Sequence, residues 1–393
     1  MIIAARRAAI IAVALVLVWR ILQVNLVLYD GNGRPRFAGL DAGVVGEGAD
    51  ASALRQVLLA NPGQVDALVL LARRQEASGN TEQARRSLDA ASELAPNDRN
   101  VLAANAQFRL AQGDFARALP MLDQLVDAYP ETRSSAFGVL ARLLSEGREP
   151  AAWKKIVARK PEWIGPFIES SCRQATDPGL LVPLLAGVSK SRASGAEAAC
   201  VIDRLREGNR WQEAYQVWLN TLPGDRLSFV GYVYNGSFDF PLTGQGFDWR
   251  PTRGREREVG HVVEIATAPD VNRKRALRIT YNGKRQSDVP IAQYLAALPG
   301  RYELSGFAQP QSIGAGRGVR WAMRCVKAGE PGRLLGASER FVGSSEWRRF
   351  AFEVTVPADC PGQVLQAEPV GADEGAVYLS GAIWFDDIVL RQL

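Results

Sequence analysis

The sequence predicts a multidomain α plus β protein with an N-terminal transmembrane helix, an α-solenoid and a C-terminal antiparallel β-sandwich of jelly-roll type. Three observations support this fold class: an apolar run near the N-terminus, a helical pattern that recurs in the first half, and short alternating segments in the second half. The expected parts are a signal anchor at residues 1–29, a flexible tether at 30–50, the solenoid at 51–224 and the sandwich at 225–393.

Composition excludes several classes of protein. The chain has 393 residues, 47% hydrophobic and 23% charged, so it can bury real cores. Its net charge of +5 is too small to argue for nucleic-acid binding. His261 is the only histidine, which excludes multi-histidine metal centres and makes a histidine-dependent enzyme unlikely on composition alone.

The N-terminal apolar run begins after Arg6 and Arg7 and covers residues 8–29, close to the ~20 residues that a helix needs to cross a bilayer. Its strictly apolar part also suits a cleaved signal peptide, but no small-x-small cleavage site follows it directly. We therefore expect an uncleaved signal anchor, with a cleaved signal and a buried helix as alternatives. The short N-terminal tail favours an inside N-terminus, with the rest of the chain exported.

The cysteine pattern fits that orientation. Cys172 and Cys200 lie in one half of the chain, Cys325 and Cys360 in the other, and no pair has CxxC spacing. In an exported protein we expect the bonds Cys172–Cys200 and Cys325–Cys360, each worth about 3 kcal/mol in the chain-entropy model. In the cytosol the same residues would be small buried hydrophobes.

A repeat begins near residue 65. Small residues in it allow close helix packing, glycines turn the chain between helices, and a proline closes each unit. The recurring pairs are Leu68 and Leu102, Gly79 and Gly113, Ala84 and Ala118, Leu88 and Leu122, and Pro96 and Pro130.

This pattern resembles the tetratricopeptide repeat, although the tryptophan and tyrosine positions of that consensus are not kept. After Pro130 the pattern predicts off-period helices at residues 134–146, 151–158 and 180–189, and a further repeat unit at 196–223. The resemblance implies a groove for a protein partner; a simple spacer is the alternative.

Beyond Gly224 the hydrophobic period changes to that of β-strands. Strands are expected at residues 278–281, 302–309, 319–325, 350–356 and 383–390, and residues 291–297 are the one segment that could form a helix. The motifs "YNGSFDFP", "GFDWR", "LPGRYELSGFAQ", "WRRFAFEVTVP" and "IWFDDIVL" occur in an order similar to that of the galactose-binding-like jelly roll of family 4/9 carbohydrate-binding modules. The whole layout resembles accessory proteins of bacterial exopolysaccharide clusters.

The strand alternation predicts a candidate carbohydrate-binding face. Trp321 and Met323 should face the core, so their neighbours should face outward. If the strands share a sheet, their outward residues join hydrogen-bonding groups to an aromatic ring, as sugar recognition requires. A solvated sheet face is the alternative. The candidates are Arg278, Thr280, Phe307, Gln309, Arg320, Arg324, Gln366 and Glu368, with Trp249 in a loop-like segment as a further residue that could bind sugar or pack.

Three aspartates are candidates for a structural Ca²⁺, because hard oxygen ligands suit that ion: Asp239, Asp386 and Asp387. Solvated strand ends are the alternative, and no other cofactor is expected. Asp386 and Asp387 are adjacent and should point to opposite faces, which poorly suits a glycosidase carboxylate pair.

These observations predict a non-catalytic scaffold in the bacterial inner membrane, with most of the chain in the periplasm. The resemblances imply binding to a polysaccharide, and the arginines favour an acidic one because the guanidinium fork suits carboxylates. A protein partner is expected in the solenoid groove. The alternatives are a glycan-active enzyme that uses the sandwich, and a purely protein-binding scaffold whose sandwich has no ligand.

Overall fold

The structure, a computed structural model, describes residues 48–174, 176–188, 195–252, 260–268, 275–286, 289–314, 317–326, 332–371 and 377–393. It also describes the backbone of β1 (Val27–Tyr29) and β2 (Pro35–Phe37), which form an antiparallel pair. Apart from these two strands and residues 48–50, the predicted membrane helix and tether lie outside the described residues. Within the described part of the chain, no helix is both long and apolar enough to cross a bilayer.

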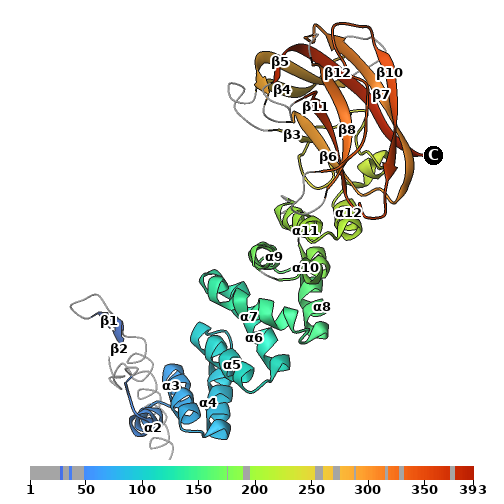
Figure 1. Ribbon diagram of the computed structural model, residues 1–393. Coiled ribbons are helices and arrows are strands. Elements are labelled where there is room, and N and C mark those ends of the chain that lie inside the picture. The colour runs from blue at the N-terminus through green and yellow to red at the C-terminus, as the bar shows by residue number, and fades with distance from the viewer. Residues whose placement is uncertain are drawn as a thin grey trace, which may run out of the picture. The chain divides into compact units, whose positions relative to one another are not determined.

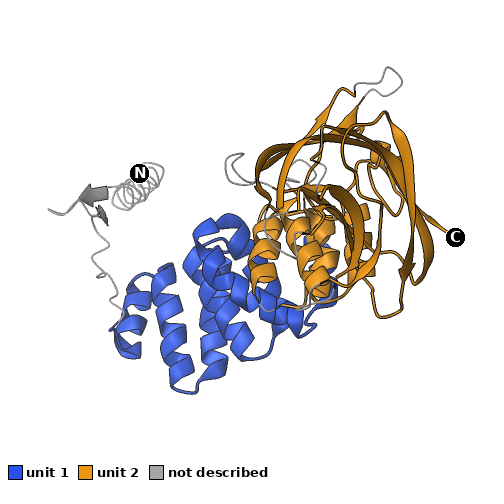
Figure 2. Ribbon diagram, turned by 45° about the horizontal axis from the view of Figure 1, so that its top comes forward, with its two compact units in different colours: residues 1–156 blue, residues 157–393 orange. Residues whose placement is uncertain are grey.

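The chain divides into two compact units, residues 1–156 and 157–393 (Figure 2). Helices come first and strands follow, and the second unit includes several helices as well as the strands. The predicted boundary at 224/225 lies inside this second unit, at the start of the 3-10 turn η4 (Gly224–Phe229). The helices are α2 (Ala51–Ala60), α3 (Val65–Ala77), α4 (Thr81–Leu94), α5 (Arg99–Ala111), α6 (Phe115–Ala128), α7 (Arg133–Ser145), α8 (Pro150–Arg159), α9 (Ile164–Arg173), α10 (Pro178–Leu181), α11 (Ala196–Glu207) and α12 (Trp211–Leu219), with 3-10 turns η1 (Pro130–Thr132), η2 (Val182–Gly187) and η4 (Gly224–Phe229).

The first unit consists of helical hairpins, as the repeat predicts. Gly79 and Gly113 adopt the left-handed conformation, with φ of 77° and 72°, between the two helices of each hairpin. Gly147, with φ of 63°, makes the same turn between α7 and α8 and follows Gly113 at the spacing that separates Gly113 from Gly79. The repeat therefore continues in register through α8, and the prediction that its period is lost after Pro130 is wrong for this hairpin.

The second unit contains a sandwich of two five-stranded antiparallel sheets (Figure 1). We call them the β12 sheet, with strand order β10-β7-β12-β5-β4, and the β8 sheet, with order β3-β6-β11-β8-β9. The strands are β3 (Arg250–Pro251), β4 (His261–Ala266), β5 (Ala276–Gln286), β6 (Ile291–Leu295), β7 (Gly300–Gln311), β8 (Val319–Cys325), β9 (Leu334–Ala337), β10 (Arg348–Val356), β11 (Gln363–Pro369) and β12 (Val377–Gln392).

Residues 291–297, the segment that could have been a helix, begin with strand β6 instead. Ile291, Gln293 and Leu295 are buried, and the residues between them are half-buried, which is the period of a strand. The buried Gln293 amide accepts from the backbone N–H of Tyr234 and donates to its carbonyl, so its polar atoms are satisfied in the core.

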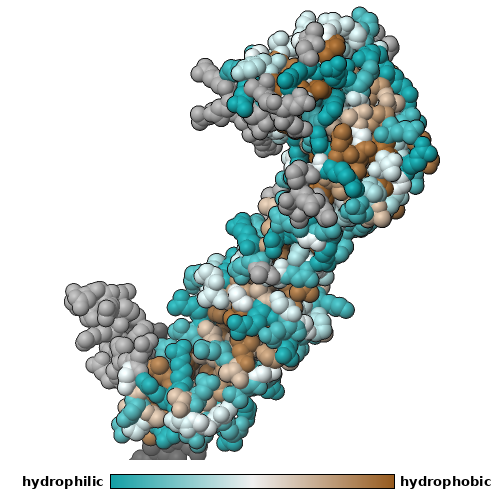
Figure 3. Space-filling view, in the orientation of Figure 1, coloured by the Kyte–Doolittle hydropathy of each residue, from teal (hydrophilic) through white to brown (hydrophobic). Residues whose placement is uncertain are grey.

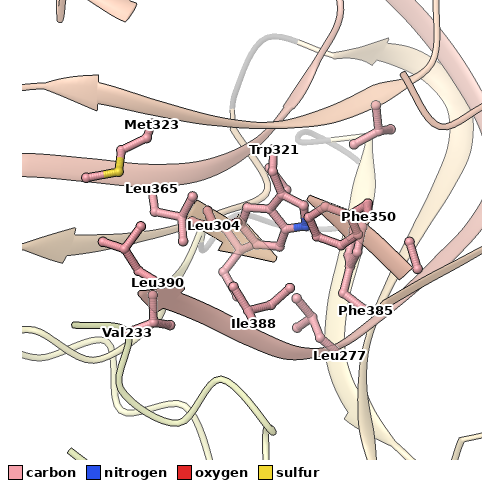
Figure 4. Close-up of a cluster of buried hydrophobic side chains, with 14 of the residues drawn as sticks. Val233, Leu277, Leu304, Trp321, Met323, Phe350, Leu365, Phe385, Ile388 and Leu390 are labelled. Atoms are coloured by element: carbon pink, nitrogen blue, oxygen red, sulfur yellow. The ribbon is translucent and has the colours of Figure 1, made fainter. Parts of the chain in front are cut away.

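The sandwich core lies between the two sheets and is rich in aromatic rings (Figure 4). Trp321 is fully buried, with its ring centroid 5.1 Å from that of Phe385 and 5.5 Å from that of Trp249. Trp249 is also fully buried, and its indole N–H donates to the carbonyl of Asn235 at 3.1 Å. Both tryptophans therefore pack inside the sandwich, and neither ring is available as a sugar platform.

Both predicted disulfides are present in the second unit. Cys172–Cys200 joins α9 to α11, with Cα atoms 6.3 Å apart. Cys325–Cys360 joins the end of β8 to the turn before β11, with Cα atoms 5.6 Å apart. The second bond therefore ties strand β8 to the turn that leads into its neighbour β11.

Helices α11 and α12 pack against one end of the β8 sheet (Figure 1). The buried Trp211 ring lies 5.8 Å from Tyr294 and 6.4 Å from Phe247, measured between ring centroids. Gly362 leaves room for this ring, since a Cβ there would lie 1.9 Å from the Trp211 side chain. The fit between Gly362 and Trp211 joins these helices to the sandwich.

Candidate functional site

The predicted binding residues are divided between two outer faces. Arg278 and Thr280 lie on β5, and Phe307 and Gln309 lie on β7, both in the β12 sheet. Arg320, Arg324, Gln366 and Glu368 lie on β8 and β11 in the other sheet. The structure therefore does not form the single face that would exist if all these strands shared a sheet. Alternation places a side chain on one side of its strand, but it does not specify which strands are neighbours.

On the β8 sheet, four of the predicted residues meet around one carboxylate. Glu368, with a side chain 8% exposed, accepts from Arg320 at 2.9 and 2.7 Å and from Arg324 at 3.2 and 3.1 Å. Gln366 donates to the same carboxylate at 2.7 Å. We call these four residues the Glu368 cluster. Two guanidiniums and one carboxylate give it a formal charge of +1.

The pKa of Glu368 reflects these contacts. Burial raises it, but the hydrogen bonds from Arg324, Gln366 and Arg320 together outweigh that effect and leave the pKa below its ordinary value. Glu368 is therefore held as a carboxylate. A glycosidase acid needs the opposite shift, because it must carry a proton at neutral pH.

A row of four residues in register crosses the same face and includes Gln366 of this cluster. Ala292 on β6, Gln366 on β11, Ala322 on β8 and Ala337 on β9 are paired in register, so they point to the same side of the sheet. Tyr294 lies two residues beyond Ala292 and shares this side. The β8 sheet thus combines planar hydrogen-bonding groups and a half-buried aromatic ring on one face.

Sequence reasoning missed the residues around Tyr294. Arg206 of α11 lies over its ring, 4.1 Å from the centroid, and Arg250 of β3 lies 4.9 Å from it. Reading residues 291–295 as a strand would have placed Tyr294 outward. No local pattern indicates that Arg206, assigned to the solenoid, reaches this sheet.

The outer face of the β12 sheet has a different character. Trp384 is 6% exposed, and the Arg278 guanidinium lies 5.3 Å from its ring. Its indole N–H donates to Gln311 at 3.2 Å. Ala266, Ala276 and Trp347 pack around it. Of the predicted residues here, Thr280 pairs with Ala382 and Phe307 with Asp386 in the strand ladders, while Gln309 pairs with Trp384. The Trp384 ring on this face is therefore covered by neighbouring side chains.

The three candidate calcium ligands do not form an acidic cluster. Asp386 is buried and accepts from the N–H of Asp387 at 2.8 Å, and Asp239 is exposed and accepts from Ser237 at 2.7 Å. Among the residues that the structure describes, no three His, Cys, Asp or Glu side chains are grouped so as to hold a metal ion. The proposed Ca²⁺ therefore stays a prediction.

The solenoid contains a cavity of about 320 Å³ that is bordered by α3, α4 and α5. The lining residues are Ala72, Arg73, Glu76, Leu88, Ala104 and Gln107.

Fold and site together define a class of protein in which helical repeats of the tetratricopeptide kind precede an antiparallel β-sandwich. Residues 47–108 match the family model of the tetratricopeptide repeat. No curated protein sequence matches the chain.

Several solved structures are similar to the sandwich. A CBM4 module is 17% identical with a TM-score of 0.31, over 41% of this chain and 99% of that one. A putative sugar-binding protein from Bacteroides thetaiotaomicron is 11% identical with a TM-score of 0.32, over 42% and 100%. The CBM22-1 xylan-binding domain from Paenibacillus barcinonensis is 18% identical with a TM-score of 0.29, over 40% and 91%.

Proposed function

We propose that this protein is a non-catalytic scaffold, anchored in the bacterial inner membrane, that binds an acidic polysaccharide in the periplasm during exopolysaccharide assembly or export. The Glu368 cluster carries the proposal, because among the described residues it presents two guanidiniums around one carboxylate on the outer face of the β8 sheet. A protein partner binds the solenoid cavity beside Arg73 and Glu76. The apolar run at residues 8–29 supports the anchor, and the two disulfides support an oxidising compartment.

The preference for an acidic polymer follows from the charge of the cluster. Arg320 and Arg324 are 25% and 19% exposed, and Glu368 fixes both guanidiniums, while Arg324 also donates to the carbonyl of Gly332 at 3.2 Å. A fixed guanidinium loses less entropy when it binds a ligand carboxylate. Each contact is weak and screened by salt, so many repeats of the polymer must bind together to give useful affinity.

The test is retention of the full chain by an acidic polysaccharide and by its carboxyl-reduced, neutral form. We expect Arg320→Ala/Arg324→Ala to lose the preference for the acidic form, and Arg320→Lys/Arg324→Lys to lose much of it because lysine lacks the planar fork. Arg301→Ala/Arg349→Ala on the β12 sheet removes the same charge and is the matched control. Equal retention of both polymers by the wild-type protein in low salt would refute the proposal.

The location has its own test. A reporter active only in the periplasm, fused after Leu393, should be active, while a cytoplasmic reporter at the same position should not. The opposite result would reverse the proposed orientation without affecting the binding assay.

A purely protein-binding sandwich is the second candidate, and one observation favours it. Five of the exposed large hydrophobic residues lie around η4 and the C-terminal end of β12, where Figure 3 shows hydrophobic surface gathered: Leu227, Phe229, Tyr232, Leu298 and Leu393. This candidate predicts no polysaccharide retention at all, so the same assay separates the two functions.

A further inference from the structure

A second arginine pair lies on the same outer face as the Glu368 cluster. Arg206 and Arg250 contact the ring of Tyr294 and share the carboxylate of Asp203, which lies 3.3 Å from Arg250 and in direct contact with Arg206. We call these four residues the Asp203 cluster. Like the Glu368 cluster, it has two guanidiniums and one carboxylate.

The strand ladders place both clusters on one side of the sheet. Arg250 pairs with Ala292, Ala292 with Gln366, and Gln366 with Ala322, which lies between Arg320 and Arg324 on β8. Directly paired residues point to the same face. Arg250 on β3 is three strands away from Arg320 and Arg324 on β8, so the backbones that carry these arginines are about 14 Å apart at ~4.8 Å per strand.

Among the described residues, the two guanidiniums of the Asp203 cluster share one carboxylate, which leaves one positive charge uncompensated. The Arg206 side chain is 9% exposed, and its Nε and Nη1 atoms have no hydrogen-bond partner among the described residues. The Nε atom of Arg250 also lacks a partner within the described part of the chain. Burial, followed by the charge of Arg250, lowers the pKa of Arg206. A bound anion would reduce the repulsion between the guanidiniums of Arg206 and Arg250.

The cluster is open on one side. Arg250 is 29% exposed and Asp203 is 46% exposed, whereas Arg206 is enclosed. An anion can therefore approach Arg250 directly, while Arg206 supplies charge and holds the ring of Tyr294. Arg206 is thus a positioning residue, and Arg250 is the residue that would contact the ligand.

We propose that the outer face of the β8 sheet has two anion subsites, the Glu368 and Asp203 clusters, that bind carboxylate-bearing sugar units at a fixed separation along one polysaccharide chain. This inference rests on the proposed function and adds that helix α11, which lies outside the sandwich, supplies part of the site. A ligand long enough to reach both subsites gains affinity, while a short one occupies a single subsite.

The experiment compares a galacturonate dimer with a galacturonate hexamer on the full chain, by calorimetry at low salt. In the wild-type protein we expect the hexamer to bind at least about fivefold more tightly than the dimer, which is the upper range for one exposed ion pair. Arg250→Gln and Arg206→Gln should remove this gain and leave dimer binding at the Glu368 cluster. Arg204→Gln, a change of the same charge on the same helix, is the control, because Arg204 is paired with Glu207 and 42% exposed.

The outcomes separate this inference from the proposed function. A hexamer gain that persists in Arg250→Gln overturns the second subsite but leaves the Glu368 cluster as the binding site. Equal affinity of the wild-type protein for dimer and hexamer would also overturn the second subsite and leave the Glu368 cluster as the binding site. If neither oligomer binds, both proposals are wrong. Arg250→Gln decides the matter even if Arg206→Gln fails to fold, because Arg250 is partly exposed.

Discussion

The two outer faces of the sandwich use arginine in different ways. On the β12 sheet, Arg278 lies over the buried ring of Trp384, so the cation helps to close the face. On the β8 sheet, Arg320 and Arg324 surround Glu368 and remain partly exposed. The same residue type, placed outward by the same alternation, can thus cover a face or equip it for a ligand, and the neighbouring strands determine which.

The largest test of this difference replaces one tryptophan at each face. Trp211 is 3% exposed against the β8 sheet, and Trp384 is 6% exposed on the β12 sheet, so Trp211→Ala and Trp384→Ala should each lower the free energy of unfolding by about 3–5 kcal/mol. Only Trp211→Ala should also weaken polysaccharide retention, because its ring packs against Tyr294. Denaturant unfolding and the retention assay measure the two effects. Equal loss of retention in both variants would remove the functional distinction.

A smaller effect is expected from Glu368→Gln, which leaves two partly buried guanidiniums without their carboxylate. We expect a loss of about 2–3 kcal/mol, somewhat less than for a fully buried pair. Glu353→Gln on the β12 sheet is the control, since its pair with Arg301 is 67% exposed on both sides and should contribute about 0–1 kcal/mol. Similar losses in the two variants would show that the Glu368 cluster is no more than a surface pair.

The pH dependence of stability sharpens the same contrast. The pKa of Glu368 is lowered in the folded protein. Its ionisation therefore stabilises the folded protein at pH values above the ordinary glutamate pKa of about 4.3. This stabilisation is lost as the pH falls through the lowered pKa of the folded protein. The stability difference between wild type and Glu368→Gln should therefore be constant at neutral pH and shrink in acid. A difference that grows as the pH falls would contradict the direction of the shift.

The smallest expected effect is that of Arg278→Ala. Its contact with Trp384 and its 3.5 Å pair with Glu264 are partly exposed, so we expect a loss of about 1 kcal/mol in unfolding free energy. Polysaccharide retention should not change. A clear loss of retention would assign a binding role to the β12 sheet and restore the wider face that the sequence suggested.

Local patterns predicted the elements better than the site. Strand Val319–Cys325 and both disulfides agree with the sequence prediction, since alternation and cysteine spacing are local signals. The third hairpin was detectable too, because Gly147 continues the repeat. The division of the binding residues between two sheets depends on strand order, which alternation does not contain. The packing of Trp249 in the core and the reach of Arg206 to Tyr294 likewise depend on long-range contacts.

The Cys325–Cys360 bond gives the β8 sheet a covalent crosslink. The β12 sheet has none, because the four cysteines of the chain form this bond and the Cys172–Cys200 bond between α9 and α11. It ties the strand that carries Arg320 and Arg324 to the turn that leads into the strand of Glu368. In a compartment that keeps thiols reduced, hydrogen bonds and packing alone would hold these strands together. Oxidation of these two thiols would then be the step that joins the strand of Arg320 and Arg324 covalently to the turn before β11.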